Sequence, residues 1–439
     1  MKMKQKNLLI IVNIVLIFCF FLTACDQEVD DDSNLPARYG EFGRNIANEL
    51  AEKFPERFPG SDQEEQAANW LVSELEDLGY EPQIQNFSAI DSDGNGIESQ
   101  NVIVEIAGMG FHLDDEDENS ESTMTQSDNT ESKSIEQDVN KNYIIIGAHY
   151  DTPIKTNVIQ ESGDGDGIHN NAAGVASLIT LAQQMKDLPP GYTTKLIFFG
   201  AGEANFAGSI AYFENMTEEE KSSLEVMYNV DRIYAGDKVY AHSGVNSIIS
   251  EYEKDYEKRQ KLYEMTDVYY NNLLLTNNDF ALYTNQNIFS VDSPATGESA
   301  LFREWTTHIG DHTVFDEADI PIVFIESFEY DVDSYAELGK ETTDSYFANV
   351  NGIIDFSNLD SSNYLNTYFE AAELEETEEV FVDSSESQED TESGVTQIIS
   401  LENLKQNKNI DRLERRVNNG ALLLLVCLRY AGADYDLND

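Results

Sequence analysis

Hydrophobic residues between positions 61 and 79 recur at the spacing of an amphipathic helix. Ser61 and Glu64 stand three residues apart at its start, as in a capping box, and Gly79 supplies a stop at its end. The apolar positions between them are Ala67, Leu71, Leu75 and Leu78. Because these positions lie three or four residues apart, they predict a helix that packs one face against a core.

Several apolar runs have the length of buried strands and alternate with helical segments. The strand-like runs are residues 101–108, 143–151, 195–202 and 320–327, and residues 170–185 have a helical pattern. The run at 143–151 is almost continuously apolar, which is typical of a central strand covered on both faces. The alternation predicts one α/β domain, a three-layer α/β/α sandwich around a mixed, mostly parallel sheet. Ligands of such folds gather at the carboxyl ends of the strands.

Two acidic, serine-rich segments interrupt this pattern, at about residues 112–141 and 371–397. Both are short of large apolar residues, so we expect solvated loops or insertions rather than linkers between domains. Residues 409–432 contain an apolar stretch that is too short to span a bilayer, and we expect a packed terminal helix there. The folded part is therefore expected to be a single domain over residues 41–439.

The first residues have the pattern of a bacterial lipoprotein signal. A basic start is followed by an apolar stretch and then by the sequence LTAC, which resembles a lipobox and ends at Cys25. We expect residues 1–24 to be a signal peptide, Cys25 to be lipidated and residues 25–40 to form a polar stalk. The protein would then be anchored to the cell membrane through its N-terminal lipid, on the extracytoplasmic side. An uncleaved membrane anchor with an incidental cysteine is the alternative.

The charge and the cysteines narrow the classes of partner and site. The chain has 27 Lys and Arg against 83 Asp and Glu, a formal net charge of −56. That balance argues against nucleic acid or an anionic membrane surface as a partner. Only Cys427 lies in the expected folded part, which leaves no intrachain disulfide and no cysteine-based zinc site there.

Residues of the types that bind metals stand beside the ends of predicted strands and helices. They are His149, Asp151, Asn170, Glu203, Asp231 and His312. Because residues i and i+2 of a strand face the same way, the carboxylate of Asp151 can orient the imidazole of His149. Each residue alone has an ordinary interpretation, such as a hydrogen-bonded histidine or an aspartate that caps a helix. Their order along the chain is far less expected by chance.

This order, with the motifs GAHYDT and DHTVFDEADIP, resembles the zinc exopeptidase family of aminopeptidase S and aminopeptidase Y. The family includes bacterial leucyl aminopeptidases, glutaminyl cyclases, and the non-catalytic transferrin receptor and nicastrin. The resemblance covers about residues 42–345 and the terminal helix. It implies the zinc exopeptidase fold, one or two zinc ions, and a peptide or protein as substrate or ligand.

The resemblance also implies roles for single residues. His149 would bind one zinc ion together with Asp231, and Asp151 would orient the imidazole of His149. Glu203 and His312 would hold a second zinc ion. All of these positions carry the residue types that the family pattern requires.

Two positions depart from the family. Asn170 stands where the family has an aspartate that bridges both metals, and Gly202 stands where it has the glutamate that acts as general base. A neutral amide offers one oxygen and no charge to two divalent ions, and loss of a general base costs about 10²–10⁴-fold in rate. Glu161, Asp164 and Asp166, in the loop before Asn170, are candidates to replace the lost carboxylate.

The sequence therefore predicts a surface lipoprotein of the zinc aminopeptidase family that hydrolyses N-terminal peptide bonds with impaired catalysis. The alternative is a catalytically inactive protein that retains the peptidase fold and binds peptides, proteins or a metal. A cyclase of the glutaminyl type ranks last, because that chemistry also uses the missing glutamate.

Overall fold

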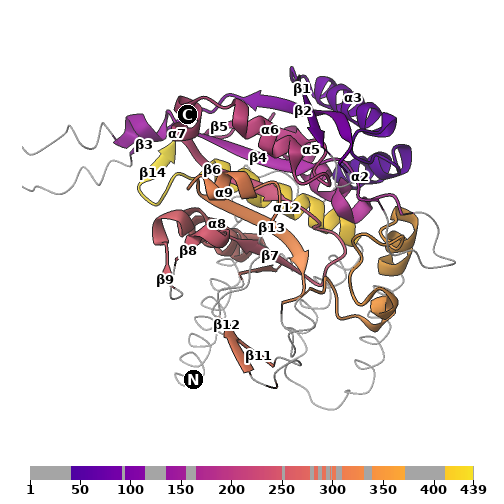
Figure 1. The fold of residues 1–439 in the computed structure, drawn as a ribbon. Helices are drawn as coiled ribbons and strands as arrows, with labels where there is room; N and C mark the ends of the chain where they lie inside the picture. Colours follow the sequence, from indigo (N-terminus) through magenta and orange to yellow (C-terminus); the bar gives the residue numbers. More distant parts are fainter. Residues whose placement is uncertain are drawn as a thin grey trace, which may run out of the picture. The chain divides into compact units, whose positions relative to one another are not determined.

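The computed structural model describes a central sheet and the helices that flank it (Figure 1). The described residues are 41–90, 94–113, 135–154, 165–249, 253–276, 281–284, 289–292, 297, 299–302, 309–330, 339–370 and 411–438. The expected signal peptide, Cys25, the stalk and the acidic segment at 371–397 lie outside these ranges.

Eight strands form the central sheet, in the order β1-β2-β5-β4-β6-β13-β7-β10. Their bounds are β1 Gln83–Ile90, β2 Gly96–Ile106, β4 Tyr143–His149, β5 Thr193–Phe199, β6 Leu224–Val230, β7 Lys238–His242, β10 Leu282–Tyr283 and β13 Ile322–Phe328. β5, β4, β6 and β13 pair in parallel in the centre, as does β10 with β7, whereas the pairs β1–β2, β2–β5 and β13–β7 are antiparallel. Every residue of β4 is buried, which confirms the predicted central strand.

Helices cover both faces of this sheet. The helices of the first face are α2 (Glu41–Lys53), α3 (Asp62–Asp77), α5 (Ala173–Gln184), α8 (Tyr256–Thr276) and α12 (Arg412–Leu428). The helices of the other face are α6 (Ala207–Asn215) and α9 (Thr313–Glu317). Because side chains alternate across a strand, β4 supplies Ile144 and Ile146 to the first core and Ile145 to the second. The three-layer sandwich predicted from the sequence is confirmed.

The predicted amphipathic helix is α3, and its start links it to the sheet. Ser61 Oγ accepts a hydrogen bond from the Glu64 N–H at 3.1 Å, which confirms Ser61 as the cap. The Glu64 carboxylate, however, accepts from the Gly60 N–H at 2.5 Å rather than from Ser61, and also from Ser99 Oγ at 2.8 Å and the Ala201 N–H at 2.7 Å. Glu64 therefore connects α3 to β2 and to the loop after β5.

The terminal helix α12 packs against α5 and α2, as expected from the sequence. Its first turn is capped by Asp411, whose carboxylate accepts from the N–H groups of Leu413 and Glu414. Gly43 of α2 lies directly against Val417 of α12, so the two helices approach closely. Among the described residues, no helix is long and apolar enough to cross a membrane.

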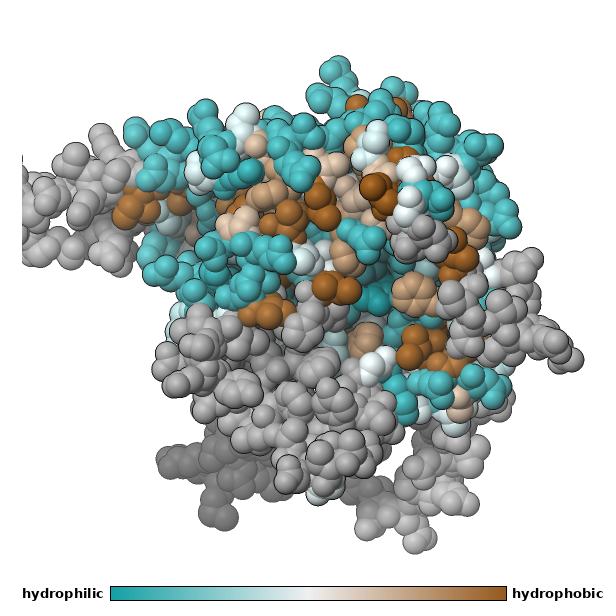
Figure 2. All heavy atoms as spheres, in the orientation of Figure 1, coloured by the Kyte–Doolittle hydropathy of each residue, from teal (hydrophilic) through white to brown (hydrophobic). Residues whose placement is uncertain are grey.

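Shorter elements surround the sandwich. They are α7 (Glu218–Ser223), β3 (Phe111–Leu113) paired with β14 (Tyr435–Leu437), β8 (Ile248–Ile249) paired with β9 (Glu253–Lys254), and β11 (Phe289–Asp292) paired with β12 (Ser299–Phe302). The expected insertion at 112–141 thus begins inside β3, and its residues 135–139 are helical, while 114–134 lie outside the described ranges. Hydrophilic residues cover much of the described surface in Figure 2, in keeping with the excess of carboxylates.

Candidate active site

The candidate site lies where parallel strands of the sheet end. His149 is the last residue of β4, Asp231 directly follows β6, and Glu203 lies in the loop after β5. Asn170 belongs to the turn Ile168–Ala172 before α5, and His312 caps α9. Since the carboxyl ends of neighbouring parallel strands meet at one edge, the topology brings these segments together. All of these side chains are buried except that of Glu203, which is half-buried.

His149 lies between two carboxylates, as the sequence predicted for Asp151. Its Nδ1 is 3.3 Å from Asp151 Oδ1, and its Nε2 is 3.3 Å from Asp231 Oδ1. Burial alone would lower the pKa of His149, but the hydrogen bonds with Asp151 and Asp231 raise it well above the usual value. The structure therefore favours a charged imidazole that is neutralised from both sides.

Asp151 also fixes the loop that carries Glu203. Its Oδ1 accepts from the Gly202 N–H at 2.8 Å, and its Oδ2 accepts from the Glu203 N–H at 2.9 Å. The carboxylate is buried, so each of these bonds is made away from water. One aspartate therefore orients both the imidazole of His149 and the backbone of the neighbouring loop.

The backbone at Gly202 packs directly against the side chain of His149. A Cβ atom added to Gly202 would lie 2.6 Å from Cβ and 2.8 Å from Cγ of His149, and 3.1 Å from Asp151 Oδ1. Such distances are far below van der Waals contact, so a glutamate fits this position only if the chain moves. The structure therefore leaves no room for a side chain at Gly202, the position where the resemblance implies a general base.

Asn170 contacts Glu203, and it does so through its amide nitrogen. Nδ2 donates to Glu203 Oε1 at 2.8 Å and to Asp355 Oδ1 at 2.7 Å. Burial, followed by repulsion from Asp355, raises the pKa of Glu203 to about 8. Asn170 Oδ1 is buried without a hydrogen-bond partner among the described residues. A hydrogen-bond donor therefore stands where the resemblance implies a bridging carboxylate.

Arg232 supplies a permanent positive charge to the same cluster. Its Nε lies 3.4 Å from Asp231 Oδ2, its Nη1 lies 3.2 Å from Asp355 Oδ2, and its Nη2 lies 3.5 Å from Glu326 Oε2. Burial would raise the pKa of Asp231, but the charge of Arg232 and the bond to His149 hold it well below its usual value. One guanidinium therefore neutralises carboxylates from three separate segments.

His312 packs against side chains of β13 and β6. Its ring stacks on Phe324 with centroids 4.6 Å apart, and its Nδ1 is 3.4 Å from Asn229 Nδ2. Burial lowers its pKa to about 4, so the ring is neutral near pH 7. Within the described part of the chain, Glu203 and His312 share no hydrogen bond or ion pair, and their assignment to a second zinc stays a prediction.

Asp166 is tied into the fold, which argues against it as a substitute base. Its carboxylate accepts from the Ser362 N–H at 2.9 Å, from Ser362 Oγ at 2.6 Å and from the Ile168 N–H at 3.2 Å. These bonds fix the Asp166 carboxylate against Ser362 and the backbone of Ile168. Glu161 and Asp164, the other two candidates, lie outside the described residues.

Sequence reasoning missed three charged residues of this site. Arg232 directly follows Asp231, and a basic residue after a buried strand was the signal that could have indicated it. Asp311 is buried, and burial raises its pKa to about 7. Its position beside His312 was a signal as well. Asp355 lies in a distant loop and follows no recognisable pattern.

The residues present fit a pair of zinc ions poorly. Structural and catalytic zinc sites use three or four carboxylate, imidazole or thiolate donors. Here the side chain at the bridging position turns a nitrogen toward Glu203, and Arg232 already neutralises Asp231. No cluster of three or more His, Cys, Asp or Glu side chains that could hold a metal occurs in the described ranges. His149 and Asp231 remain the best pair of donors.

Comparisons with known proteins agree with the fold. A sequence model of peptidase family M28 matches residues 132–350. The alkaline phosphatase isozyme conversion protein of Escherichia coli is 22% identical over 311 residues, which are 69% of this chain and 77% of that protein. An aminopeptidase of Pseudomonas aeruginosa is 29% identical over 92 residues, which are 21% of this chain but only 16% of that enzyme.

Two solved structures show the same fold at low sequence identity. A zinc-dependent exopeptidase from Parabacteroides distasonis is 14% identical, with a TM-score of 0.51 over 90% of this chain and 100% of that one. BSAP, a zinc aminopeptidase from Bacillus subtilis, is 12% identical, with a TM-score of 0.51 over 92% of this chain and 99% of that one. Through residues 132–350 and its zinc exopeptidase-like fold, the chain belongs to peptidase family M28.

Proposed function

We propose that this protein binds the N-terminal end of peptides or proteins at the site around Glu203, and that hydrolysis of the bound peptide is lost. The family and the named relatives support a peptidase-like function in general. The observation that carries the narrower proposal is the orientation of Asn170, whose amide donates to both Glu203 and Asp355. At the position where the resemblance implies a bridging aspartate, the side chain is therefore engaged in hydrogen bonds with protein groups rather than available to a metal.

The chemistry of the cluster suits a cationic ligand. Glu203 is half-buried and can be reached from solvent, while Asp355 repels it and burial raises its pKa to about 8. A peptide's α-amino group is a cation near neutral pH. An ammonium group beside Glu203 would stabilise the ionised carboxylate, and this gain favours a free N-terminus over a blocked one.

Among the described residues, no carboxylate stands at the position where the resemblance implies a general base, which supports the loss of hydrolysis. Attack of water on a peptide bond needs a group that accepts the proton of that water, within about 3 Å of it. Gly202 has no side chain and Asp166 is bound to Ser362. Because the residues fit two zinc ions poorly, we derive no step through a metal.

A second candidate function is slow, metal-dependent hydrolysis of N-terminal peptide bonds. The contacts of His149 with Asp151 and Asp231 favour it, since they match the roles that the resemblance implies for one zinc ion. The two functions differ in a simple respect: the second needs zinc for turnover, and the first needs only a free N-terminus for binding.

The experiment combines an activity assay with a binding assay on the purified protein. Aminoacyl chromogenic substrates with and without added zinc should give no turnover. A fluorescent peptide with a free N-terminus should bind, its N-acetylated form should not, and Glu203→Gln should weaken binding at least tenfold. Glu219→Gln, an exposed carboxylate on α7, is the matched control. Equal binding of both peptides would contradict the proposal, and zinc-dependent turnover abolished by a chelator and by Glu203→Ala would support the second candidate.

We also propose that Cys25 carries a lipid and anchors the protein on the outer face of the cell membrane. The LTAC sequence after an apolar stretch supports this, and the charge of −56 supports partners other than nucleic acid. Labelling with a radioactive fatty acid should mark the protein, and Cys25→Ala should abolish the label and release the protein from the membrane fraction.

A further inference from the structure

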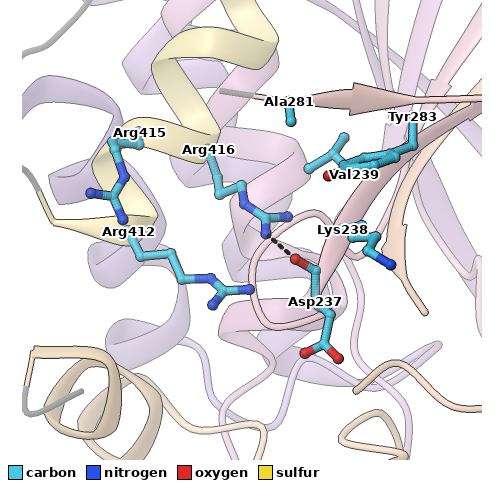
Figure 3. A pocket seen from close by; sticks show the side chains of 8 residues that line it. All are labelled: Asp237, Lys238, Val239, Ala281, Tyr283, Arg412, Arg415 and Arg416. Carbon is cyan, nitrogen blue, oxygen red and sulfur yellow. Dashed lines mark hydrogen bonds between the residues drawn. The ribbon is translucent and has the colours of Figure 1, made fainter. Parts of the chain in front are cut away.

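A cavity of about 220 Å³ lies where the first turn of α12 meets β7 and β10 (Figure 3). It is lined by Arg412, Arg415 and Arg416 of α12 and by Lys238 of β7, with Tyr283 on the opposite wall. None of these residues belongs to the candidate active site. In a chain with only 27 basic residues, the convergence of four of them on one cavity indicates a selective attraction for negative charge.

Two of the arginines donate hydrogen bonds to backbone carbonyl oxygens of the loop before β7. Arg416 donates to the carbonyl oxygens of Ile233 at 3.2 Å, Gly236 at 3.1 Å and Asp237 at 3.1 Å. Arg412 donates to the carbonyl oxygen of Gly236 at 2.6 Å. Carbonyl oxygens hold a guanidinium in place without cancelling its charge. The loop before β7 therefore holds the guanidinium groups of Arg412 and Arg416, which line the cavity, in fixed positions.

Asp237 is the one carboxylate among the described residues that line the cavity, and its side chain is bound to other groups. Asp237 accepts from Thr342 Oγ1 at 2.6 Å and from the Thr343 N–H at 2.9 Å, and in Figure 3 it meets Arg416 through its backbone oxygen. Lys238 Nζ lies 3.0 Å from Glu329, which offsets the lysine charge. Among the described residues that line the cavity, three of the four basic side chains come from α12.

The arginines of α12 also repel one another. Burial lowers the pKa of Arg416 well below its usual value, and the charges of Arg412 and Arg415 lower it further. An anion held between guanidinium groups would remove this repulsion and could form paired hydrogen bonds of the kind that arginine makes with carboxylates and phosphates.

We propose that this cavity binds a small oxyanion group, a phosphate or a carboxylate. Its volume lies below the roughly 300–1,000 Å³ of pockets for drug-sized ligands, so it suits a free anion or the charged end of a larger molecule. Asp411 already caps the N–H groups of Leu413 and Glu414, so the arginine side chains rather than the helix end provide the attraction. This site is independent of the function proposed above.

Equilibrium dialysis of the full-length protein in detergent, with radiolabelled inorganic phosphate at constant ionic strength, tests this assignment. We expect saturable binding at one site per chain and a rise in melting temperature with phosphate. Arg415→Gln removes one positive charge from the cavity and should weaken binding at least tenfold. Arg412 and Arg416 keep their bonds to residues 233–237 in this variant, so the cavity should keep its shape. Arg44→Gln, in the Arg44–Glu41 pair of α2 where Arg44 is partly buried, removes the same charge outside the cavity and should not change phosphate binding.

Ala281→Glu is a second variant, which places a carboxylate at the wall of the cavity without removing an arginine. It should also weaken phosphate binding, even if Arg415→Gln fails to fold. Competition distinguishes the two classes of anion: displacement of phosphate by sulfate indicates a site for phosphate-like anions, and displacement by succinate indicates a site for carboxylates. Either result supports an oxyanion site. The absence of saturable binding, or equal binding by wild type, Arg415→Gln and Ala281→Glu, would overturn the proposal.

Discussion

The side-chain nitrogen of Asn170 lies 2.8 Å from Oε1 of Glu203. An amide donor and a carboxylate acceptor at this distance stabilise each other without a metal, whereas two carboxylates at the same distance would repel. The identity of residue 170 therefore decides whether this cluster is stable by itself or needs a cation.

Asn170→Asp should destabilise the protein and make its stability depend on zinc. The new carboxylate would face Glu203 and Asp355, and uncompensated buried charges cost about 3–5 kcal/mol. Urea denaturation with and without zinc measures the effect, and Asn69→Asp, exposed on α3, is the control. Unchanged stability of Asn170→Asp without zinc would show that the amide is not needed.

Gly202→Ala should lower the free energy of unfolding by about 1–3 kcal/mol, which is typical of overpacking. The added Cβ would lie 2.6 Å from Cβ of His149, and neither atom can rotate away. Gly96→Ala in β2, where nothing lies within 4 Å of the added atom, should be tolerated. We expect Gly202→Glu combined with Asn170→Asp to stay inactive for the same reason, and turnover in that double variant would contradict the closed shape of the site.

Arg232→Met should destabilise the protein by about 3–5 kcal/mol, because it leaves buried carboxylates without their cation. Arg232 pairs with Asp231, Glu326 and Asp355. Chemical denaturation at pH 7 gives the value, and Arg44→Met on the surface of α2 should cost at most about 1 kcal/mol. The loss should shrink at pH 5, where the carboxylates take up protons more readily.

Protonation of Glu64 predicts the direction of one pH effect on stability. Burial, followed by repulsion from Asp151, raises the pKa of Glu64 from 4.5 to about 8. Between these values the folded state binds a proton that the unfolded state does not, so this group makes stability fall as pH rises from about 5 to 8. The expected slope is about 1 kcal/mol per pH unit.

Denaturation curves at pH 5, 6, 7 and 8 measure that slope. Glu64→Gln, which cannot ionise, should flatten it, and Glu65→Gln, exposed on the same helix, should leave it unchanged. A wild-type protein that gains stability from pH 5 to 8, with Glu64→Gln identical, would show that Glu64 is ionised throughout.

Much of the fold could be predicted from the sequence because it rests on local patterns. The apolar spacing of α3, the cap at Ser61 and the continuous apolar run of β4 are each read within one segment. Hydrophobic burial acts on these periodicities directly, so the helices, the buried strands and the layered sheet follow from them. The placement of His149 and Asp231 at strand ends was predictable for the same reason.

The sequence by itself determined the family and the layered α/β fold, and it predicts that Asn170 and Gly202 are altered positions of the site. Only the tertiary structure decided how the remaining charges are balanced. Asp355 contacts Asn170 and Arg232 from a loop far along the chain. Gly202, in the loop after β5, packs against His149 at the end of the neighbouring strand β4. Charge neutralisation and close packing join residues that are distant in sequence, and no periodicity along the chain records which of them will meet.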